Sequence, residues 1–181
     1  MASVVSTRAL FLDRDGVINV NHGYVHKPEE MDFLPGIFAL CRAAVQRGYR
    51  LIVVTNQAGI GRGYYTEADF AAVTAWMREQ SKAEGAEITA VYHCPYHPEH
   101  GVGEYRRESD WRKPGPGMLL AAAREHALHL PDCVMVGDME SDVEAGLRAG
   151  VGHVIRYAEQ GATDSRAHRV VQSLEQCIEA L

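Results

Sequence analysis

The chain has 181 residues, of which 46% are hydrophobic and 23% charged, a composition typical of a soluble globular protein that forms one domain, here residues 1–181. Its formal net charge of -6 argues against non-specific binding to nucleic acid or to an anionic membrane. No apolar run is long enough to span a bilayer, and residues 1–8 lack the apolar core of a signal peptide. We therefore expect a cytoplasmic monomer without membrane or nucleic-acid partners, whose four cysteines are reduced.

Short apolar runs, typical of buried strands, alternate with segments that have the apolar periodicity of amphipathic helices. In chain order the predicted elements are a strand at 9–12, a helix from Pro35 to Gly48, a strand at 51–54, a helix capped by Thr66, a strand at 88–93, a helix at 118–129, a strand at 133–136, a helix at 141–149, a strand at 153–155 and a helix from Ser173. The predicted apolar face of the first helix consists of Ile37, Leu40, Cys41, Ala44 and Val45. This alternation predicts an α/β fold, a parallel sheet with helices on both faces, with a long irregular insertion over residues 94–112.

Three of the predicted strands end in polar residues: Asp13 and Asp15, then Thr55 and Asn56, then Asp138. Since ligands bind outside the carboxyl ends of parallel strands, these side chains should meet at one edge of the sheet. Lys113, at the entry to a helix, could reach the same edge. Each of these residues taken alone also fits a turn or a surface position, but their convergence on one edge indicates a functional site.

The set suits phosphoryl transfer. Asp13 is a candidate nucleophile, and Asp15 could protonate a leaving oxygen and later deprotonate water. Three acids, Asp13, Asp15 and Asp138, would repel one another without a hard cation, and Mg²⁺ is the cation that also bridges phosphate oxygens. Lys113 and the Thr55 hydroxyl could neutralise and hydrogen-bond the phosphoryl oxygens.

The four segments Asp13-Arg14-Asp15-Gly16-Val17, Thr55, Lys113 and Gly137-Asp138-x-x-x-Asp142 resemble, in order, the signature motifs of haloacid-dehalogenase-type phosphatases. The resemblance covers residues 9–155 and implies a Rossmann-like fold. It also implies Mg²⁺-dependent catalysis through an aspartyl phosphate, with Asp13 as nucleophile and Asp15 as acid and base. The metal ligands would be the side chains of Asp13 and Asp138 and the backbone carbonyl of Asp15. The chain is too short to include a large cap domain.

A closer resemblance is to the heptose-bisphosphate phosphatase family, which removes the C7 phosphate of D-glycero-D-manno-heptose 1,7-bisphosphate in the synthesis of activated heptose for lipopolysaccharide or glycoprotein. It is carried by the segments Asp13–Asn19, His22–Val25, Thr55–Ile60, Arg62-Gly63 and Arg112-Lys113-Pro114. The resemblance implies a phosphorylated sugar as substrate, lined by Asn21, His22, Gly23, Tyr24, Thr55, Asn56, Gln57 and Ala58. Arg112 would recognise its distal phosphate.

Four basic residues, Arg14, Arg62, Arg112 and Lys113, fall in the loops expected to form the site and suit a doubly anionic substrate. For Arg62, a solvated position in the loop fits as well as contact with substrate.

Members of that family hold a structural zinc ion in the loop that corresponds to residues 94–112. This chain keeps Cys94, but Tyr96, Ser109 and Trp111 stand at the other ligand positions, and Ser and Trp are not zinc ligands. A replacement site built from His93, Cys94, His97 and His100 stays open at this point. We expect instead that packing of Tyr96, Tyr105 and Trp111 holds the loop.

Two other functions fit the same motifs. Histidinol-phosphate phosphatases share the four motifs and the zinc-loop plan, although the segments His22–Val25 and Gly61–Gly63 favour the heptose family. A non-enzymatic alternative is a signalling domain that accepts a phosphoryl group on Asp13. Such a domain has no need of an acid two residues later, so Asp15 favours the phosphatase.

Overall fold

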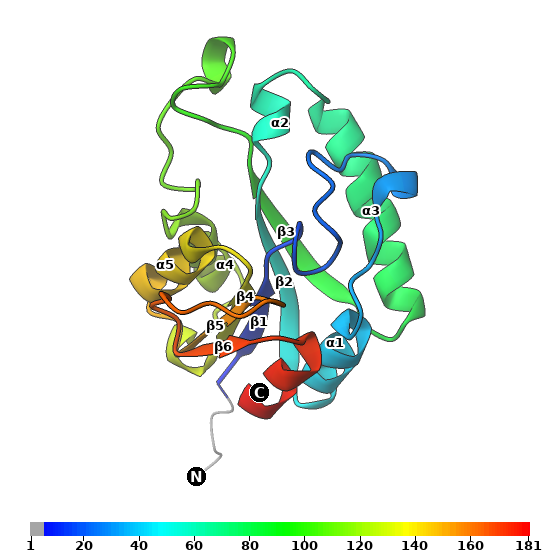
Figure 1. Cartoon of the computed structure of the whole chain (residues 1–181), viewed down its shortest axis with the longest axis vertical. Coiled ribbons are helices and arrows are strands. Elements are labelled where there is room, and N and C mark those ends of the chain that lie inside the picture. The colour runs from blue at the N-terminus through cyan, green and yellow to red at the C-terminus, as the bar shows by residue number, and fades with distance from the viewer. Residues whose placement is uncertain (1–5) are drawn as a thin grey trace.

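The computed structural model describes residues 6–181, and its centre is a six-stranded sheet in which all neighbouring strands are parallel (Figure 1). The spatial order is β3-β2-β1-β4-β5-β6. The strands are β1 (Arg8–Leu12), β2 (Tyr49–Asn56), β3 (Ile88–Cys94), β4 (Val134–Gly137), β5 (His153–Tyr157) and β6 (Arg169–Val171). The predicted parallel α/β architecture is confirmed, and β6 is an edge strand that the sequence pattern did not indicate.

Helices cover both faces of the sheet (Figure 1). The α-helices are α1 (Ile37–Gln46), α2 (Ala58–Gly61), α3 (Glu67–Ala83), α4 (Gly117–Glu125) and α5 (Glu140–Ala149). Four 3-10 turns lie at Pro28–Glu30, Gly103–Tyr105, Leu130–Asp132 and Leu174–Ala180. Helix α3 begins as predicted: the Thr66 hydroxyl accepts a hydrogen bond from the Asp69 amide, and the Asp69 carboxylate accepts one from the Thr66 amide.

Strand β1 lies between β2 and β4 and is covered on both sides. Leu10 and Leu12 pack in a core with residues of α1 and α3, whereas Ala9 and Phe11 pack with residues of α4 and α5. All four side chains are 0% exposed. Because neither face of β1 meets water, its sequence is continuously apolar rather than alternating.

The structure corrects several predicted details. Helix α4 ends at Glu125 rather than His129, because Ala127 adopts a left-handed conformation with φ of 50°. Val45 was predicted to face the core but is 41% exposed, since it lies at the margin of the apolar stripe of α1. The predicted C-terminal α-helix is a 3-10 segment, Leu174–Ala180.

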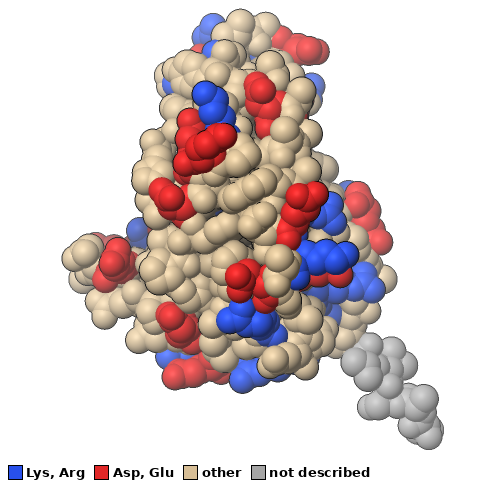
Figure 2. All heavy atoms as spheres, turned by 90° about the vertical axis from the view of Figure 1, so that its right-hand side faces the viewer, with Lys and Arg blue, Asp and Glu red and all other residues tan. Residues whose placement is uncertain are grey.

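The long loops after β1 and β3 lie at the carboxyl ends of the strands, at the upper edge of the sheet in Figure 1. They consist of irregular chain and single 3-10 turns, so no large cap domain covers this edge in the part of the chain that is described. None of the helices within residues 6–181 has both the length and the apolarity to cross a membrane. On the face shown in Figure 2, acidic and basic side chains are interspersed.

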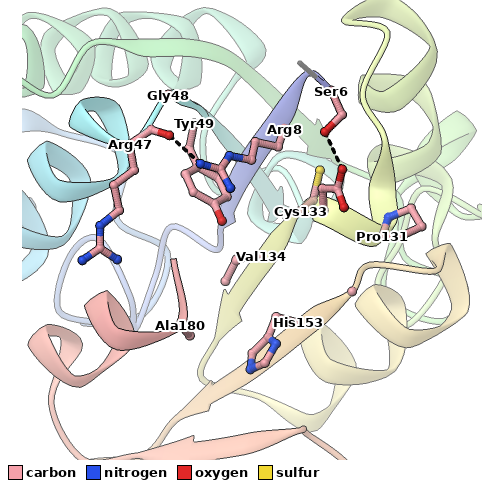
Figure 3. Close-up of a pocket in the computed structure, with 12 residues that line it drawn as sticks. Ser6, Arg8, Arg47, Gly48, Tyr49, Pro131, Cys133, Val134, His153 and Ala180 are labelled. Carbon is pink, nitrogen blue, oxygen red and sulfur yellow. Dashed lines mark hydrogen bonds between the residues drawn. The ribbon is translucent and has the colours of Figure 1, made fainter. Parts of the chain in front are cut away.

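A hollow of about 660 Å³ lies at the opposite edge, at the amino ends of the strands (Figure 3). The Arg8 guanidinium lies 4.1 Å from the centre of the Tyr49 ring and donates to the backbone carbonyl of Arg47 at 2.6 Å. The Arg47 guanidinium donates to the carbonyls of Ile178 and Leu181 at 2.5 and 3.0 Å. Arg47 therefore anchors the C-terminal segment to the end of α1, and Arg8 joins the start of β1 to the segment between α1 and β2, so each arginine has a structural role.

Candidate active site

Asp13 follows β1, and its amide continues the sheet by donating to the carbonyl of Val136 in β4 at 3.1 Å. The chain then turns sharply at Gly16, whose φ is 92°. A Cβ atom at Gly16 would lie 2.2 Å from Oδ2 of Asp138, so only glycine allows the turn and the third acid to approach each other. The pairing of β1 with β4 brings their ends together, and the turn at Gly16 lets the chain after β1 pass close to Asp138.

The side chains of Asp13, Asp138 and Asp142 form one cluster, each with a carboxylate oxygen within 4.8 Å of the others. Asp138 comes from the end of β4 and Asp142 from the first turn of α5. The predicted set of metal ligands did not include Asp142, although it stood in the quoted motif. The Asp15 side chain, in contrast, points to other partners.

Lys113 is the cation that the structure places among these acids. Its ammonium group lies 2.8 Å from Asp13 Oδ1 and 2.6 Å from Asp142 Oδ1, and it donates to the carbonyl of Val54 at 2.8 Å. Burial alone would lower the pKa of Lys113, but the two ion pairs outweigh it and raise that pKa above its ordinary value. Lys113 is therefore a permanent positive charge beside Asp13.

The acids remain electrostatically unsatisfied despite this lysine. Burial, followed by repulsion from Asp142, raises the pKa of Asp13 well above its ordinary value, and the same two causes raise that of Asp138 to about 6. Within the described residues, Oδ1 of Asp138 is buried and lacks a hydrogen-bond partner. A hard divalent cation that takes oxygen ligands fits this set of groups.

The carboxylate of Asp15 is held by donors on several sides. Arg14 donates to both of its oxygens at 2.9 and 3.0 Å, Asn19 donates to Oδ1 at 3.0 Å, and Gln57 donates to Oδ2 at 3.1 Å. Arg14 itself is 0% exposed and also donates to the carbonyl of Val25. The expectation that Arg14 serves a doubly anionic substrate is therefore wrong: its guanidinium lies beneath the site and orients Asp15.

Thr55 and Asn56 lie at the end of β2, as predicted. The Thr55 side chain is buried and its hydroxyl oxygen accepts a hydrogen bond from Gln57 at 2.9 Å. The Asn56 amide makes reciprocal hydrogen bonds with the backbone of Lys113, at 3.0 and 3.1 Å. Asn56 thus fastens the segment that presents the lysine, and the two predicted motifs are directly joined.

A hollow of about 410 Å³ opens above these groups. The predicted residues that line it are Asp13, Asp15, Asn21, Gly23, Tyr24, Thr55, Asn56, Gln57, Ala58, Arg112, Lys113 and Asp138. The sequence reasoning missed Gly59, Tyr65, Met139, Ser141 and Asp142, which also line it. Two of them carried a signal: Asp142 through its place in the fourth motif, and Gly59 through its place in the segment Thr55–Ile60.

Two predicted substrate residues do not line the hollow. His22 is turned outward and pairs with Asp32 at 2.7 Å. The guanidinium carbon of Arg62 lies 5.9 Å from the centre of the Tyr24 ring. The Nε atom of Arg62 is buried and has no hydrogen-bond partner among the described residues. Arg112 does line the hollow, and burial lowers its pKa.

The loop over residues 94–112 does not assemble the replacement zinc site. The only group of three or more potential metal ligands found among residues 6–181 is the aspartate cluster. His93 pairs with Glu67 at 2.8 Å, and Nδ1 of His97 accepts hydrogen bonds from two backbone amides. Burial raises the pKa of the Cys94 thiol, which disfavours the thiolate that zinc needs.

Aromatic and cationic contacts are present in this loop instead. The rings of Tyr96 and Tyr105 lie 6.0 Å apart, and the Arg107 guanidinium lies 3.8 Å from the centre of the Tyr96 ring. Trp111 packs against Tyr92 of β3, with ring centres 6.0 Å apart, rather than against the two tyrosines. The expected aromatic packing is therefore found, in two separate parts.

A HAD-hydrolase-like family model matches residues 110–177. The chain is 54% identical over 159 residues, 88% of this chain and 84% of the relative, to the D-glycero-alpha-D-manno-heptose-1,7-bisphosphate 7-phosphatase of Burkholderia mallei. It is 47% identical over 144 residues, 80% of this chain and 77% of the relative, to the D-glycero-beta-D-manno-heptose-1,7-bisphosphate 7-phosphatase of Vibrio cholerae.

The fold agrees with this relationship. The crystal structure of D,D-heptose 1,7-bisphosphate phosphatase from B. bronchiseptica, complexed with magnesium and phosphate, superimposes with a TM-score of 0.80 at 28% identity, covering 96% of this chain and 97% of that one. Identity, coverage and fold thus point to the same group of proteins. The chain belongs to the HAD-like hydrolases, in the family of heptose-1,7-bisphosphate 7-phosphatases.

Proposed function

We propose that this chain hydrolyses the C7 phosphate of D-glycero-D-manno-heptose 1,7-bisphosphate through an aspartyl phosphate on Asp13. The observation that carries the proposal is the placement of Asp13 beside a buried lysine and two further acids, at the floor of an open hollow. The relatives described above, whose names state this activity, supply the substrate.

In the first step an oxygen of Asp13 attacks phosphorus and the bond from phosphorus to the C7 oxygen breaks. Lys113 lies beside Asp13 and Thr55 lines the same hollow, so the ammonium group and the hydroxyl can neutralise and hydrogen-bond the phosphoryl oxygens. Asp15, when protonated, gives its proton to the departing C7 oxygen. The sugar leaves as heptose 1-phosphate, and Asp13 carries the phosphoryl group.

In the second step water attacks the phosphorus atom of the aspartyl phosphate, and Asp15 takes its proton. The bond between phosphorus and the Asp13 oxygen breaks, so the carboxylate is regenerated and inorganic phosphate leaves. Asp15 therefore needs an orientation that serves both transfers. The donors from Arg14, Asn19 and Gln57 support such a fixed orientation.

Asp13, Asp138 and Asp142 would hold Mg²⁺, and the raised pKa values of Asp13 and Asp138 and the unpartnered Asp138 oxygen support a cation there. When bound, this ion would supply positive charge to the phosphoryl oxygens and to the acids that surround them. The expectation that Asp15 contributes its backbone carbonyl remains part of this proposal. Zinc has no place in it.

The distal phosphate at C1 would meet Arg112, with Asn21 and Tyr24 along the sugar. Arg112 lines the hollow, and its Nη1 atom donates a long hydrogen bond of 3.4 Å to the carbonyl of Tyr96, which leaves further guanidinium N–H groups that can bind an anion. Tyr24 lines the same hollow and, with φ of 53°, has a backbone conformation that few non-glycine residues adopt.

The test is a comparison of phosphate release from both anomers of the heptose 1,7-bisphosphate and from histidinol phosphate, in the presence of Mg²⁺. We expect one equivalent of phosphate per bisphosphate, with heptose 1-phosphate as product. The printed names of the relatives include both anomers, so both are assayed. Faster turnover of histidinol phosphate would contradict the proposed substrate.

A further inference from the structure

The side chain of Gln57 lies at the wall of the hollow, where it is hydrogen-bonded to three other side chains. Sequence resemblance predicted that Gln57 contacts the substrate, yet the residue is only 2% exposed. Its Nε2 atom donates to Asp15 Oδ2 at 3.1 Å and to Thr55 Oγ1 at 2.9 Å, and its Oε1 atom accepts from the Tyr65 hydroxyl. Both amide hydrogens and one lone pair of the amide oxygen are thus engaged by the protein itself.

The Tyr65 hydroxyl determines which way round the Gln57 amide lies. A reversed amide would turn its carbonyl oxygen toward the carboxylate of Asp15, where a donor is needed. The donated hydrogen bond from Tyr65 keeps the oxygen on the side of the tyrosine and the two N–H groups on the side of Asp15 and Thr55.

Tyr65 is itself fixed. Its ring is 5% exposed and stacks parallel to the ring of His26, with centres 5.0 Å apart. A Cβ atom at Gly59 would lie 2.2 Å from the Tyr65 ring, so only glycine at this position lets the ring approach. The backbone N–H of Gln57 donates to the carbonyl of Cys94 at 2.8 Å, which fixes the backbone of Gln57 against the end of β3. The tyrosine and the glutamine therefore form a rigid connection from α2 and its following loop to Asp15.

We infer that Gln57 and Tyr65 are positioning residues, which hold the carboxyl group of Asp15 in the orientation for proton transfer to and from the reacting oxygens. The inference rests on the proposed function, in which Asp15 is the acid and base. Arg14 and Asn19 restrain Asp15 on its other sides, so removal of the Gln57 restraint would let the carboxyl group rotate between them. Small errors in the placement of a reacting group lower rates strongly.

A comparison of two leaving groups distinguishes a positioning role from a purely structural one, which would affect the turnover of both esters equally. The heptose phosphate leaves as an alkoxide and needs the proton of Asp15, whereas the phenolate of p-nitrophenyl phosphate is stable enough to leave without one. In Tyr65→Phe we expect kcat for the heptose bisphosphate to fall about tenfold, with less than about a threefold change for p-nitrophenyl phosphate, and in Gln57→Leu we expect kcat for the heptose bisphosphate to fall about 50-fold. KM should change little in both variants.

Tyr92→Phe is the matched control. Tyr92 is 7% exposed and its hydroxyl donates to Glu125 at 2.5 Å, so this variant also loses a nearly buried tyrosine hydrogen bond, but away from Asp15. Both tyrosine variants should lower the melting temperature to a similar extent, and Tyr92→Phe should leave the ratio of the two kcat values unchanged.

A double variant that combines Tyr65→Phe with Asp15→Asn shows whether the loss of activity in Tyr65→Phe depends on the carboxyl group of Asp15. We expect that Tyr65→Phe causes no further loss of heptose phosphatase activity in the Asp15→Asn background. Equal losses for both esters, or a full additional loss in the double variant, would overturn the inference. If the wild-type chain leaves the heptose ester intact, the proposed function fails instead, and glycerol 3-phosphate serves as the alkyl ester in the same comparison.

Discussion

Lys113 Nζ lies 2.6 Å from Asp142 Oδ1, and each of the two side chains is only 2% exposed. The lysine comes from the segment before α4 and the acid from the first turn of α5, so this ion pair connects two helices beneath the proposed site. The same ammonium group reaches Asp13 at 2.8 Å. One cation therefore holds together acids from different elements, and its contribution to stability and to catalysis can be measured.

Replacement of Lys113 by Met should destabilise the protein and abolish turnover. The variant leaves buried aspartates without their cation, a change that costs about 3 kcal/mol of unfolding free energy. Urea unfolding of the metal-free protein measures this loss. The control is Lys82→Met, because the ion pair of Lys82 with Glu87 is 70% exposed on both sides and should contribute little. Equal stability of Lys113→Met and wild type would show that the lysine is not needed to hold the acids.

Mg²⁺ should stabilise the protein more at pH 7.5 than at pH 5. The pKa of Asp138 is raised to about 6 in the folded chain, whereas in the unfolded chain it has the ordinary carboxyl value of about 4. Between these two pH values the metal-free folded protein holds a proton on Asp138 that the unfolded chain has already released. The stability that this bound proton contributes is present at low pH and is lost as the pH rises from about 4 through about 6.

Bound Mg²⁺ would replace the proton, so its effect on the melting temperature grows as the acids ionise. Melting curves with and without MgCl₂ at pH 5 and pH 7.5 measure the difference. In Asp138→Asn the metal-free protein should lose less stability with rising pH, and the gain from Mg²⁺ should shrink. The same gain at both pH values would contradict the assignment of a cation to this cluster.

Asp13→Asn should fold normally and lose at least about 1000-fold in kcat, because the amide is a poor nucleophile. The substitution removes one of three clustered acids, so we expect no decrease in melting temperature. Rapid acid quenching of wild type with substrate labelled at the C7 phosphate should trap label on the protein, and Asp13→Asn should trap none. Measurable residual turnover in the variant would speak against covalent catalysis.

The sequence was sufficient to predict which residues end the strands. The continuous apolar runs before Asp13 and Thr55 could be read as buried strands, and parallel topology then required their ends to share an edge. The pairing of Asn56 with the backbone of Lys113, 57 residues apart, follows from that shared edge.

Side-chain direction could not be predicted in the same way. Arg14 stands in a motif that suggests contact with substrate, but the turn after β1 points it into the protein. Gln57 lines the hollow, yet its side chain is hydrogen-bonded to Asp15 and Thr55. His22 is turned toward Asp32 and away from the hollow. These directions depend on individual backbone angles such as the positive φ of Gly16, and apolar periodicity contains no information about them.

Purified protein should contain zinc at well below one atom per chain. His93 is engaged with Glu67 and the Cys94 thiol is buried, so the loop offers no set of tetrahedral ligands among the described residues. Elemental analysis measures the zinc content directly. Treatment with EDTA followed by Mg²⁺ should restore full activity, and a lasting loss that zinc alone reverses would contradict the prediction.

Arg112→Ala should impair the binding of substrate much more than the chemistry. Arg112 lines the hollow, and a charge-assisted hydrogen bond to a distal phosphate contributes about 1.5–3 kcal/mol, so KM for the heptose bisphosphate should rise about 10- to 100-fold. Arg112→Lys should recover part of this loss, because a lysine keeps the charge without the paired donors of a guanidinium. p-Nitrophenyl phosphate has no second phosphate, so its kinetic constants should stay close to those of wild type. A similar loss for both esters would place Arg112 at the transferred phosphate rather than at the distal one.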